Sequence, residues 1–346
     1  MSFGSQARQV QFNNAMGRVM VAAVRVHKAG GPEALTYEEI DVPAPGPGQT
    51  RIKQHACGIN YIDTYFRSGL YAPPPPQSLP FVAGNEGAGE VVAVGPGVTE
   101  IKVGDRVGYV SALGGYAAER LLAADRAVKL PETISYDQAA GMMLKGMTVE
   151  YLLNRTFKVR GGMNVLIHAA AGGIGLIAGQ WANMLGANVI GTVGSKEKAA
   201  LAKANGYHHT ILYREEDFVA KVKEITGGKM CEVVYDGVGK DTFPKSLDCI
   251  KPLGMFVSFG NTSGSVEAFN INILQTKGSL FATRPTLNTY AAKREDLLAI
   301  ANDLFSTVAS GKVKIPVNQR YALKDAAQAH RDLESRATTG SSILIP

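Results

Sequence analysis

Residues 165–175 read VLIHAAAGGIG, a short apolar run that leads into a glycine-rich turn. The run has the aliphatic composition of a buried strand, and a helical pattern follows the turn. This is the strand–turn–helix fingerprint of a dinucleotide-binding loop, with Ala170 where the first glycine usually stands. Gly172 would let the backbone approach a pyrophosphate, and Gly175 would let the helix pack closely on the strand. The turn therefore predicts dinucleotide binding, with a purely structural turn as the alternative.

The segments around this turn alternate between strand and helix. Strands are expected at 165–169, 188–193, 209–212, 231–235 and 254–259, and helices at 175–185, 196–205, 217–226 and 241–249. Repeated units of this size imply a parallel, doubly wound sheet with right-handed crossovers. A further helix is expected over 135–153, because Ser135 is a good N-cap. The pattern predicts an α/β fold.

The chain before this region is rich in short β-branched runs separated by glycine and proline, at 21–26, 36–42, 89–94, 106–109 and 127–130. They predict a β-rich domain. The tail should form helices over 293–310 and 324–331 and strands near Tyr321 and at 342–344, and return to that domain. We therefore predict one domain from 1–145 and 285–346 and a second from 146–284. Residues 1–18 are interpreted as an N-terminal extension, with a transit peptide as the alternative.

Composition excludes several classes of protein. The 346 residues are 45% hydrophobic and 19% charged, which is not the balance of a disordered chain. Three scattered cysteines exclude a disulfide framework and favour a reducing compartment, so we expect a cytoplasmic protein. No apolar stretch reaches about 20 residues, so no transmembrane helix is expected. The pI of about 9.1 is compatible with nucleic acid, but scattered lysines suit anionic small molecules equally well.

The end of the second strand indicates which dinucleotide is bound. Proteins that bind NAD usually carry an acidic residue there, about 20 residues after the glycines, for the ribose 2′-hydroxyl. Here the strand ends in Gly194 and Ser195, and Lys196 and Lys198 follow. A carboxylate would repel a 2′-phosphate, whereas a small residue, a hydroxyl and a lysine accommodate one. We therefore expect NADPH, with the pair Tyr213 and Arg214 covering the adenine. The alternative for Lys196 and Lys198 is that they only cap a surface helix.

Motifs along the chain then match one family pattern. They are HACGINYIDTYFRSGLY (55–71), GNEGAGEVVAVGPGV (84–98), VGDRV (103–107), LKGMTVEYLL (144–153), HAAAGGIGL (168–176), YREEDF (213–218), SFGNTSG (258–264), KGSLFATRPTL (277–287) and ESRATTGSSILIP (334–346). From about residue 20 onwards the sequence closely resembles the quinone oxidoreductases of the medium-chain dehydrogenase/reductase superfamily, the group that includes ζ-crystallin. The resemblance implies a Rossmann domain and a GroES-like catalytic domain.

The resemblance bears on metal binding. In zinc-containing alcohol dehydrogenases of this superfamily, a Cys, a His and a Cys hold the catalytic metal. The matching positions here are Asn60, Asn85 and Leu144. Neutral amide and alkyl groups are not tetrahedral zinc ligands. We therefore expect no catalytic metal, and a substrate that accepts hydride without one, as a quinone does.

The resemblance also implies the residues of the site. On the substrate side, Asn60 could donate a hydrogen bond to a quinone oxygen, Tyr65 and Tyr71 could stack on the ring, and Arg284 is a further candidate. The implied cofactor contacts are Asn60, Tyr61, Asp63, Lys145, Thr148, Gly172, Gly173, Ile174, Gly194, Ser195, Lys198, Tyr213, Gly260, Asn261, Ser263 and Arg336. Wall packing is the alternative for the two tyrosines.

Five positions have a structural interpretation. Asp63 would cap a helix that begins near Thr64, whether or not it contacts the cofactor. The alternative for Lys145 is a surface lysine, and the alternative for Arg336 is a solvated charge at a helix end. His168 lies in the predicted buried strand, so we expect a core histidine with satisfied hydrogen bonds. Cys57 is likewise expected to be buried in a strand.

These expectations define a function. We expect a zinc-independent, NADPH-dependent quinone reductase that works in a cleft between two domains. The resemblance implies a homodimer, with the segment Ser279–Thr283 as the pairing edge. The alternatives are an NADPH-dependent reductase of enone or alkenal double bonds, a non-catalytic NADPH-binding protein, and an RNA-binding protein that only the pI supports.

Overall fold

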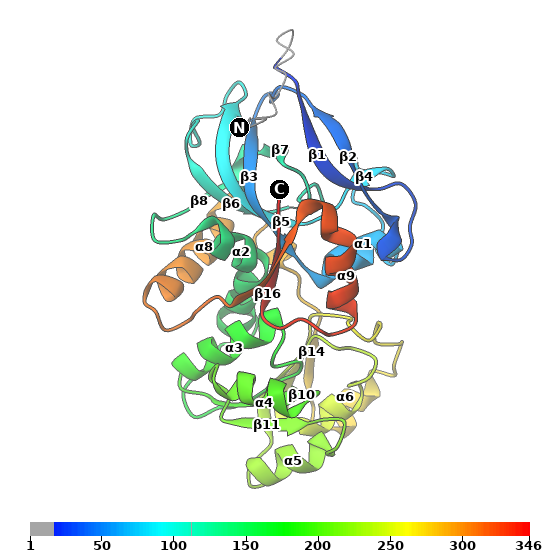
Figure 1. Cartoon of the computed structure of the whole chain (residues 1–346). Helices are drawn as coiled ribbons and strands as arrows, with labels where there is room; N and C mark the ends of the chain where they lie inside the picture. The colour runs from blue at the N-terminus through cyan, green and yellow to red at the C-terminus, as the bar shows by residue number, and fades with distance from the viewer. Residues whose placement is uncertain (1–16, 112) are drawn as a thin grey trace, which may run out of the picture.

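The computed structural model describes residues 17–111 and 113–346. The predicted extension, residues 1–18, therefore lies outside the described residues except for its last two. Figure 1 shows two lobes, one built from the N-terminal strands and the red C-terminal segment, the other from the green and yellow middle of the chain. The tail does return to the N-terminal lobe, because Ser342 and Leu344 pair with Ile59 and Cys57.

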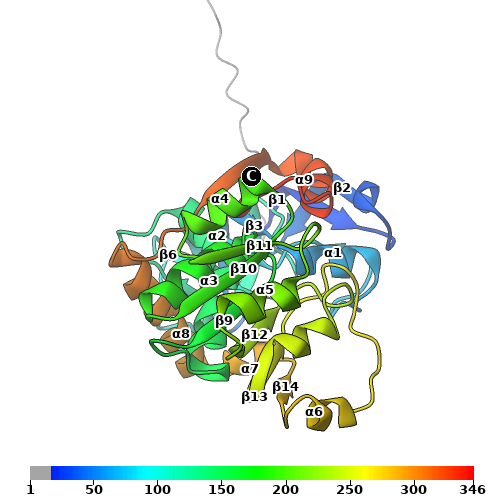
Figure 2. The ribbon, with the colours of Figure 1, turned by 90° about the horizontal axis from the view of Figure 1, so that it is seen from below.

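The middle of the chain forms a six-stranded sheet with the order β11-β10-β9-β12-β13-β14, in which every pair is parallel. Its strands are β9 (Asn164–Ile167), β10 (Asn188–Val193), β11 (His209–Leu212), β12 (Cys231–Asp236), β13 (Ile250–Ser258) and β14 (Phe281–Thr283). The crossover helices are α3 (Gly173–Met184), α4 (Lys196–Lys203), α5 (Phe218–Ile225) and α6 (Asn272–Thr276). In Figure 2, α3 and α5 lie on opposite sides of this sheet. The strand order reverses between β9 and β12, and a crevice at such a switch point is where open α/β sheets bind ligands.

The other lobe contains two sheets. A seven-stranded sheet has the order β15-β16-β3-β5-β6-β8, with β7 also paired to β3, and a small sheet has the order β2-β1-β4. The strands are β1 (Val19–Val26), β2 (Leu35–Val42), β3 (Gln49–Ile59), β4 (Phe81–Val82), β5 (Glu86–Val94), β6 (Arg106–Val110), β7 (Glu119–Ala123), β8 (Val128–Lys129), β15 (Val317–Ala322) and β16 (Ser341–Ile345). The helices are α1 (Tyr61–Ser68), α7 (Leu287–Tyr290), α8 (Arg294–Ala309) and α9 (Ala326–Glu334).

A shared hydrophobic core joins the lobes through α2 (Tyr136–Tyr151), which a short π-helix continues to Thr156. The helix begins as predicted, because Ser135 and Gln138 form a capping box, each side chain accepting the other's backbone N–H at 3.1–3.2 Å. Met147 of α2 belongs to the same buried cluster as Val165 of β9. Side-chain packing therefore fixes how the lobes meet.

Three expected elements differ in the structure. The helix expected over 241–249 is instead a turn followed by a 3₁₀ helix at Lys245–Cys249, because Pro244 has no N–H for a helix interior. Helix α3 begins at Gly173 rather than Gly175. Helix α1 begins at Tyr61 rather than near Thr64, so Asp63 is not its N-cap. Among the described residues no helix is long and apolar enough to cross a membrane.

Candidate functional site

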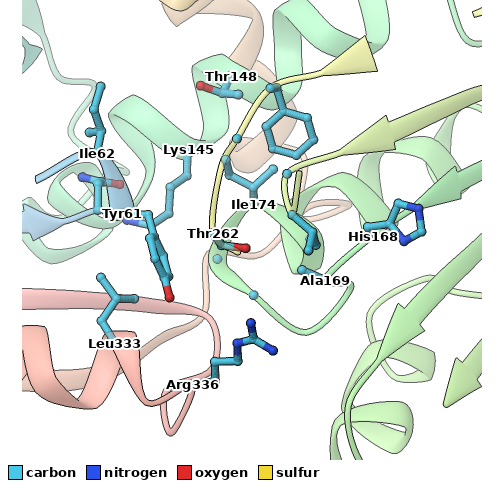
Figure 3. A pocket seen from close by; sticks show the side chains of 18 of the residues that line it. Tyr61, Ile62, Lys145, Thr148, His168, Ala169, Ile174, Thr262, Leu333 and Arg336 are labelled. Carbon is cyan, nitrogen blue, oxygen red and sulfur yellow. The ribbon is translucent and has the colours of Figure 1, made fainter. Parts of the chain in front are cut away.

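A cavity of about 1100 Å³ runs between the lobes. Figure 3 shows Tyr61, Ile62 and Lys145 on one side of it, Ile174 and Ala169 on the other, and Leu333 and Arg336 reaching in from the C-terminal segment. The volume lies just above the usual range for small-molecule sites, about 300–1,000 Å³, which suits a large ligand. Both lobes therefore contribute to one site.

The glycine-rich turn forms one wall of this cavity. Gly172 is the N-cap of α3, and Gly173 and Ile174 begin the helix beside it. A Cβ atom at Gly175 would lie 2.4 Å from the carbonyl oxygen of Ala169, so only glycine fits between helix and strand. Gly340 of the tail bridges to Gly172, which brings the C-terminal segment against the turn. The predicted strand, glycine turn and helix N-terminus are therefore present, although the Gly172 N–H itself donates to the carbonyl oxygen of Ala169 at 3.0 Å.

Cationic side chains gather at the end of β10. Ser195 caps α4 by accepting the backbone N–H of Lys198 at 3.3 Å. The Lys198 ammonium donates to the carbonyl oxygen of Arg336 at 2.7 Å, and the Arg336 guanidinium donates to the Tyr213 hydroxyl at 3.1 Å. Arg214 lies over the Tyr213 ring at 5.9 Å. All five, with Gly194, line the cavity.

The charges in this group affect one another. Burial is the main cause that lowers the pKa of Lys198, and the positive charges of Arg214 and Arg336 lower it further. An anion placed among the three would relieve that repulsion. The sequence singled out Lys198, Tyr213 and Arg336 as cofactor contacts, and Arg214 only as the partner of Tyr213 beside the adenine; the structure places the Arg214 charge close enough to Lys198 to lower its pKa.

At the other end of the cavity, Asn60 and Lys145 converge on a buried carboxylate. The Asn60 amide nitrogen donates to Glu86 Oε2 at 2.7 Å, and Glu86 Oε1 accepts the backbone N–H of Leu144 at 2.7 Å. The Lys145 ammonium donates to the carbonyl oxygen of Ile59 at 2.9 Å and lies 3.6 Å from Glu86. Lys145 is buried, not a surface lysine. Sequence analysis missed Glu86; it is the buried one of the two glutamates of strand β5, and Glu90 is exposed.

A second buried carboxylate, Asp63, lies beside the first. It accepts hydrogen bonds from the backbone N–H of Asn60 at 2.7 Å, the amide of Asn85 at 2.5 Å and the hydroxyl of Tyr116 at 2.8 Å. Burial raises the pKa of both Asp63 and Glu86. Asn60 lines the cavity and Asp63 does not, so the structure places Asp63 behind Asn60.

The two tyrosines of the predicted substrate side hold a loop of the other lobe. The Tyr65 hydroxyl accepts the backbone N–H of Asn261 at 3.0 Å, and the Tyr71 hydroxyl accepts its side-chain amide at 3.2 Å. Their rings meet edge to face, with centroids 5.2 Å apart. Both tyrosines also line the cavity, so wall packing and substrate contact are compatible roles. Asn261 bridges the lobes and is not among the lining residues.

Of the remaining candidate residues, some line the cavity and one, Ser263, lies behind its wall. Gly260, Arg284, Tyr61 and Thr148 line the cavity, and Arg284 donates to the carbonyl oxygen of Gly260 at 3.3 Å. Ser263 does not line it; its hydroxyl donates to Val238 and accepts from the backbone of Asp241.

The two predictions of burial are confirmed. His168 is buried, and its ring nitrogens bond to the hydroxyls of Thr192 at 2.9 Å and Ser246 at 3.0 Å, although the residue also borders the cavity. Cys57 is buried in β3, and burial raises its pKa to about 12.

A buried histidine links this site to α9. Arg67 donates to His330 Nδ1 at 3.1 Å and pairs with Glu334 at 2.7 Å, while His330 Nε2 lies 3.0 Å from the Tyr116 hydroxyl. Arginine has no acceptor, so His330 is neutral with its proton on Nε2, and Tyr116 is free to donate to Asp63. Burial and then the Arg67 charge lower the His330 pKa to about 3.

This pKa predicts an acid-sensitive fold. Below its ordinary pKa of 6.5, His330 gains a proton in the unfolded chain but not in the folded one. Its contribution to stability is therefore present above pH 6.5 and is lost as the pH falls towards 3, by about 1.4 kcal/mol per pH unit. Between pH 7 and pH 5, the free energy of unfolding of His330→Gln should fall by about 2 kcal/mol less than that of the wild type. Urea unfolding at both pH values measures this, and equal losses would contradict it.

The structure also shows how the three positions that match zinc ligands are used. The amide nitrogens of Asn60 and Asn85 donate to Glu86 and Asp63, and Leu144 contributes only its backbone N–H. This donor set does not fit a tetrahedral zinc ion. Within residues 17–111 and 113–346, no group of three or more His, Cys, Asp or Glu side chains is placed to hold a metal ion.

Comparisons with known proteins agree with this architecture. Residues 46–159 match the family described as alcohol dehydrogenase GroES-like domain, and residues 173–295 match the family described as zinc-binding dehydrogenase. The quinone oxidoreductase of Salmonella typhimurium is 54% identical over 94% of this chain and 100% of its own length. The solved structure of Escherichia coli quinone oxidoreductase complexed with NADPH is 52% identical over 94% of this chain and 100% of that chain, with a TM-score of 0.91.

A relative with a different name is also similar. The 2-haloacrylate reductase of a Burkholderia species is 46% identical over 94% of this chain and 99% of its own length. This chain therefore shares its α/β fold, with the Rossmann sheet and the GroES-like lobe, with enzymes that match it over nearly its whole length. The chain belongs to the quinone oxidoreductases of the medium-chain dehydrogenase/reductase superfamily.

Proposed function

We propose that this enzyme reduces quinones with NADPH in the cavity between its lobes. The observation that carries the proposal is that one continuous cavity joins the cationic group at Lys198 to the Asn60 end. The similarity to quinone oxidoreductases, one of them solved with NADPH, supports both the substrate class and the cofactor.

The residues of the binding lobe fit NADPH. The backbone N–H groups of Gly173 and Ile174, in the first turn of α3, would hold the pyrophosphate. Lys198, Arg214 and Arg336 would bind the 2′-phosphate. Gly194 and Ser195 follow β10 in place of the usual acidic residue, and Glu197 in the first turn of α4 is flanked by Lys196 and Lys198. When bound, NADPH supplies a hydride from its nicotinamide.

The other lobe would position the acceptor. The Asn60 amide is held in place by Glu86, next to the Lys145 ammonium. The second N–H of the Asn60 amide and the Lys145 ammonium would be the donors for a quinone oxygen that gains negative charge. Tyr65 and Tyr71 form an aromatic wall against which a quinone ring would lie. We propose that no zinc takes part, since the amide and alkyl groups at the ligand positions do not suit it.

The direct test follows NADPH absorbance with an ortho-quinone and repeats the assay with NADH. We expect rapid oxidation of NADPH and much slower oxidation of NADH. Equal kcat/KM values for the two cofactors would contradict the proposed 2′-phosphate site. Bound NADPH without any turnover would contradict quinone reduction.

A second candidate is the reduction of an activated carbon–carbon double bond. The similarity to a 2-haloacrylate reductase favours it, and the Arg284 guanidinium in the cavity is able to pair with a carboxylate. Assays with 2-chloroacrylate and with an uncharged enone distinguish the two functions. Turnover of these compounds at rates above that of the quinone would favour the second candidate.

We infer a homodimer that pairs through the edge of the parallel sheet. Strand β14 is the last strand in the order, and Phe281 on it is 57% exposed. An unpaired apolar edge of this kind favours pairing with a second copy. Light scattering should give twice the chain mass of 36.7 kDa for the wild type and the single mass for Phe281→Asp. A monomeric wild type at micromolar concentration would contradict the inference.

A further inference from the structure

The positions that match zinc ligands are tied together by two buried carboxylates. Glu86 accepts the Asn60 amide and the Leu144 backbone N–H, each at 2.7 Å. Asp63 accepts the Asn60 backbone N–H at 2.7 Å and the Asn85 amide at 2.5 Å. Hydrogen bonds to carboxylates therefore hold the same three positions that a metal ion would otherwise organise.

We propose that Glu86 is a positioning residue for the reaction. This inference rests on the proposed reduction of quinones in this cleft. An ionised carboxylate only accepts hydrogen bonds, so the Asn60 atom that faces Glu86 must be the amide nitrogen. Glu86 thus sets the orientation of the Asn60 amide and holds the Lys145 ammonium 3.6 Å away.

The fold makes a specific place for this carboxylate. Glu86 is 0% exposed and does not border the cavity, so it acts through Asn60 and Lys145, which do. A Cβ atom at Gly58 would lie 2.2 Å from Glu86 Oε2, so glycine is needed opposite it on β3. A buried carboxylate is costly to retain without a purpose, because burial penalises the charged form.

The first test is Glu86→Gln, with the exposed Glu90→Gln on the same strand as a matched control. The glutamine amide would face the donors of Asn60 or Leu144, so the Asn60 amide would lose its fixed orientation. We expect kcat with the quinone to fall about 10- to 100-fold, with the quinone KM little changed. The NADPH dissociation constant should change less than about threefold, because the phosphate contacts are distant. Glu90→Gln should behave as the wild type.

A double-mutant cycle tests whether Glu86 acts through Asn60. If it does, Asn60→Ala combined with Glu86→Gln should lower kcat no further than the worse single variant. Multiplied losses would contradict a positioning role through Asn60, and a Glu86→Gln variant whose kcat stays within about twofold of the wild type would contradict any positioning role.

A charge swap covers the case in which Glu86→Gln does not fold. The double variant Asn60→Asp with Glu86→Gln keeps the side-chain shapes and the net charge. The hydrogen bond between the two side chains is also kept, but the introduced glutamine now donates it and the introduced aspartate accepts it. We expect it to fold and bind NADPH with a reduced kcat, because the introduced carboxylate has no amide to donate; here a wild-type kcat would overturn the proposal. The absence of quinone turnover in the wild type itself would instead show that the proposed function has failed, and the inference would fail with it.

Discussion

Replacing Ser195 with Asp should turn the cofactor preference from NADPH towards NADH. Asp is as good an N-cap as Ser, so α4 should keep its first turn and the hydrogen bond from Lys198 N. The new carboxylate would stand where the 2′-phosphate is proposed to bind, and would also pair with the Lys198 ammonium. Two like charges about 4 Å apart repel by about 4 kcal/mol near a protein surface, which corresponds to a 100- to 1000-fold loss of kcat/KM for NADPH. Initial rates with each cofactor at a fixed quinone concentration measure this.

The matched control for that variant is Ser195→Asn. Asn caps a helix as well as Asp and has nearly the same shape, but it carries no charge. It should keep most of the preference for NADPH, so the difference between the two variants isolates the charge. If Ser195→Asp retained the wild-type ratio of kcat/KM values, the 2′-phosphate would have to bind away from the end of β10.

Features that depend on neighbouring residues could be predicted from the sequence. The apolar run and glycine spacing at 165–175 fix a strand, a turn and a helix within a few residues, and the repeated alternation that follows allows little but a parallel sheet. The replacement of the usual acidic residue by Gly194 and Ser195 at the end of the strand is equally local, although Glu197 follows between two lysines. This is why Lys198 and Tyr213 could be proposed as cofactor contacts from the sequence, and both line the cavity; Arg336, which also lines it, came from the family resemblance.

Features that depend on long-range contacts were not predictable in this way. Glu86 meets Asn60 and Leu144 only after three distant segments come together. The prediction of a helix over 241–249 from residue propensities was also wrong. In the structure the hydroxyls of Thr242 and Ser246 donate hydrogen bonds to the buried Asp236. Such side-chain hydrogen bonds compete with a regular helix.

Two glycines of the phosphate turn should show opposite effects when each is replaced by alanine. At Gly175 a Cβ atom would lie 2.4 Å from the Ala169 carbonyl oxygen and 2.6 Å from that of Ala170. These are backbone atoms of the strand-to-helix turn, and Ala169 already has a left-handed backbone with φ of 55°. Gly175→Ala should therefore destabilise the fold by about 3 kcal/mol, the upper part of the usual cost of overpacking. Urea unfolding measures this loss.

Gly172→Ala should instead weaken cofactor binding and leave stability nearly unchanged. The nearest atom to its added Cβ is the Ala169 carbonyl oxygen at 3.3 Å, and its φ of −77° suits any residue, so the empty fold tolerates the methyl group. The second glycine of this fingerprint serves the approach of the pyrophosphate, so a methyl group there should raise the NADPH dissociation constant about 10- to 100-fold. Fluorescence titration with NADPH, alongside urea unfolding, measures both quantities for both variants. Unchanged NADPH binding in Gly172→Ala would mean that the turn holds the helix on the sheet without contacting the phosphates, which is the structural alternative for this motif.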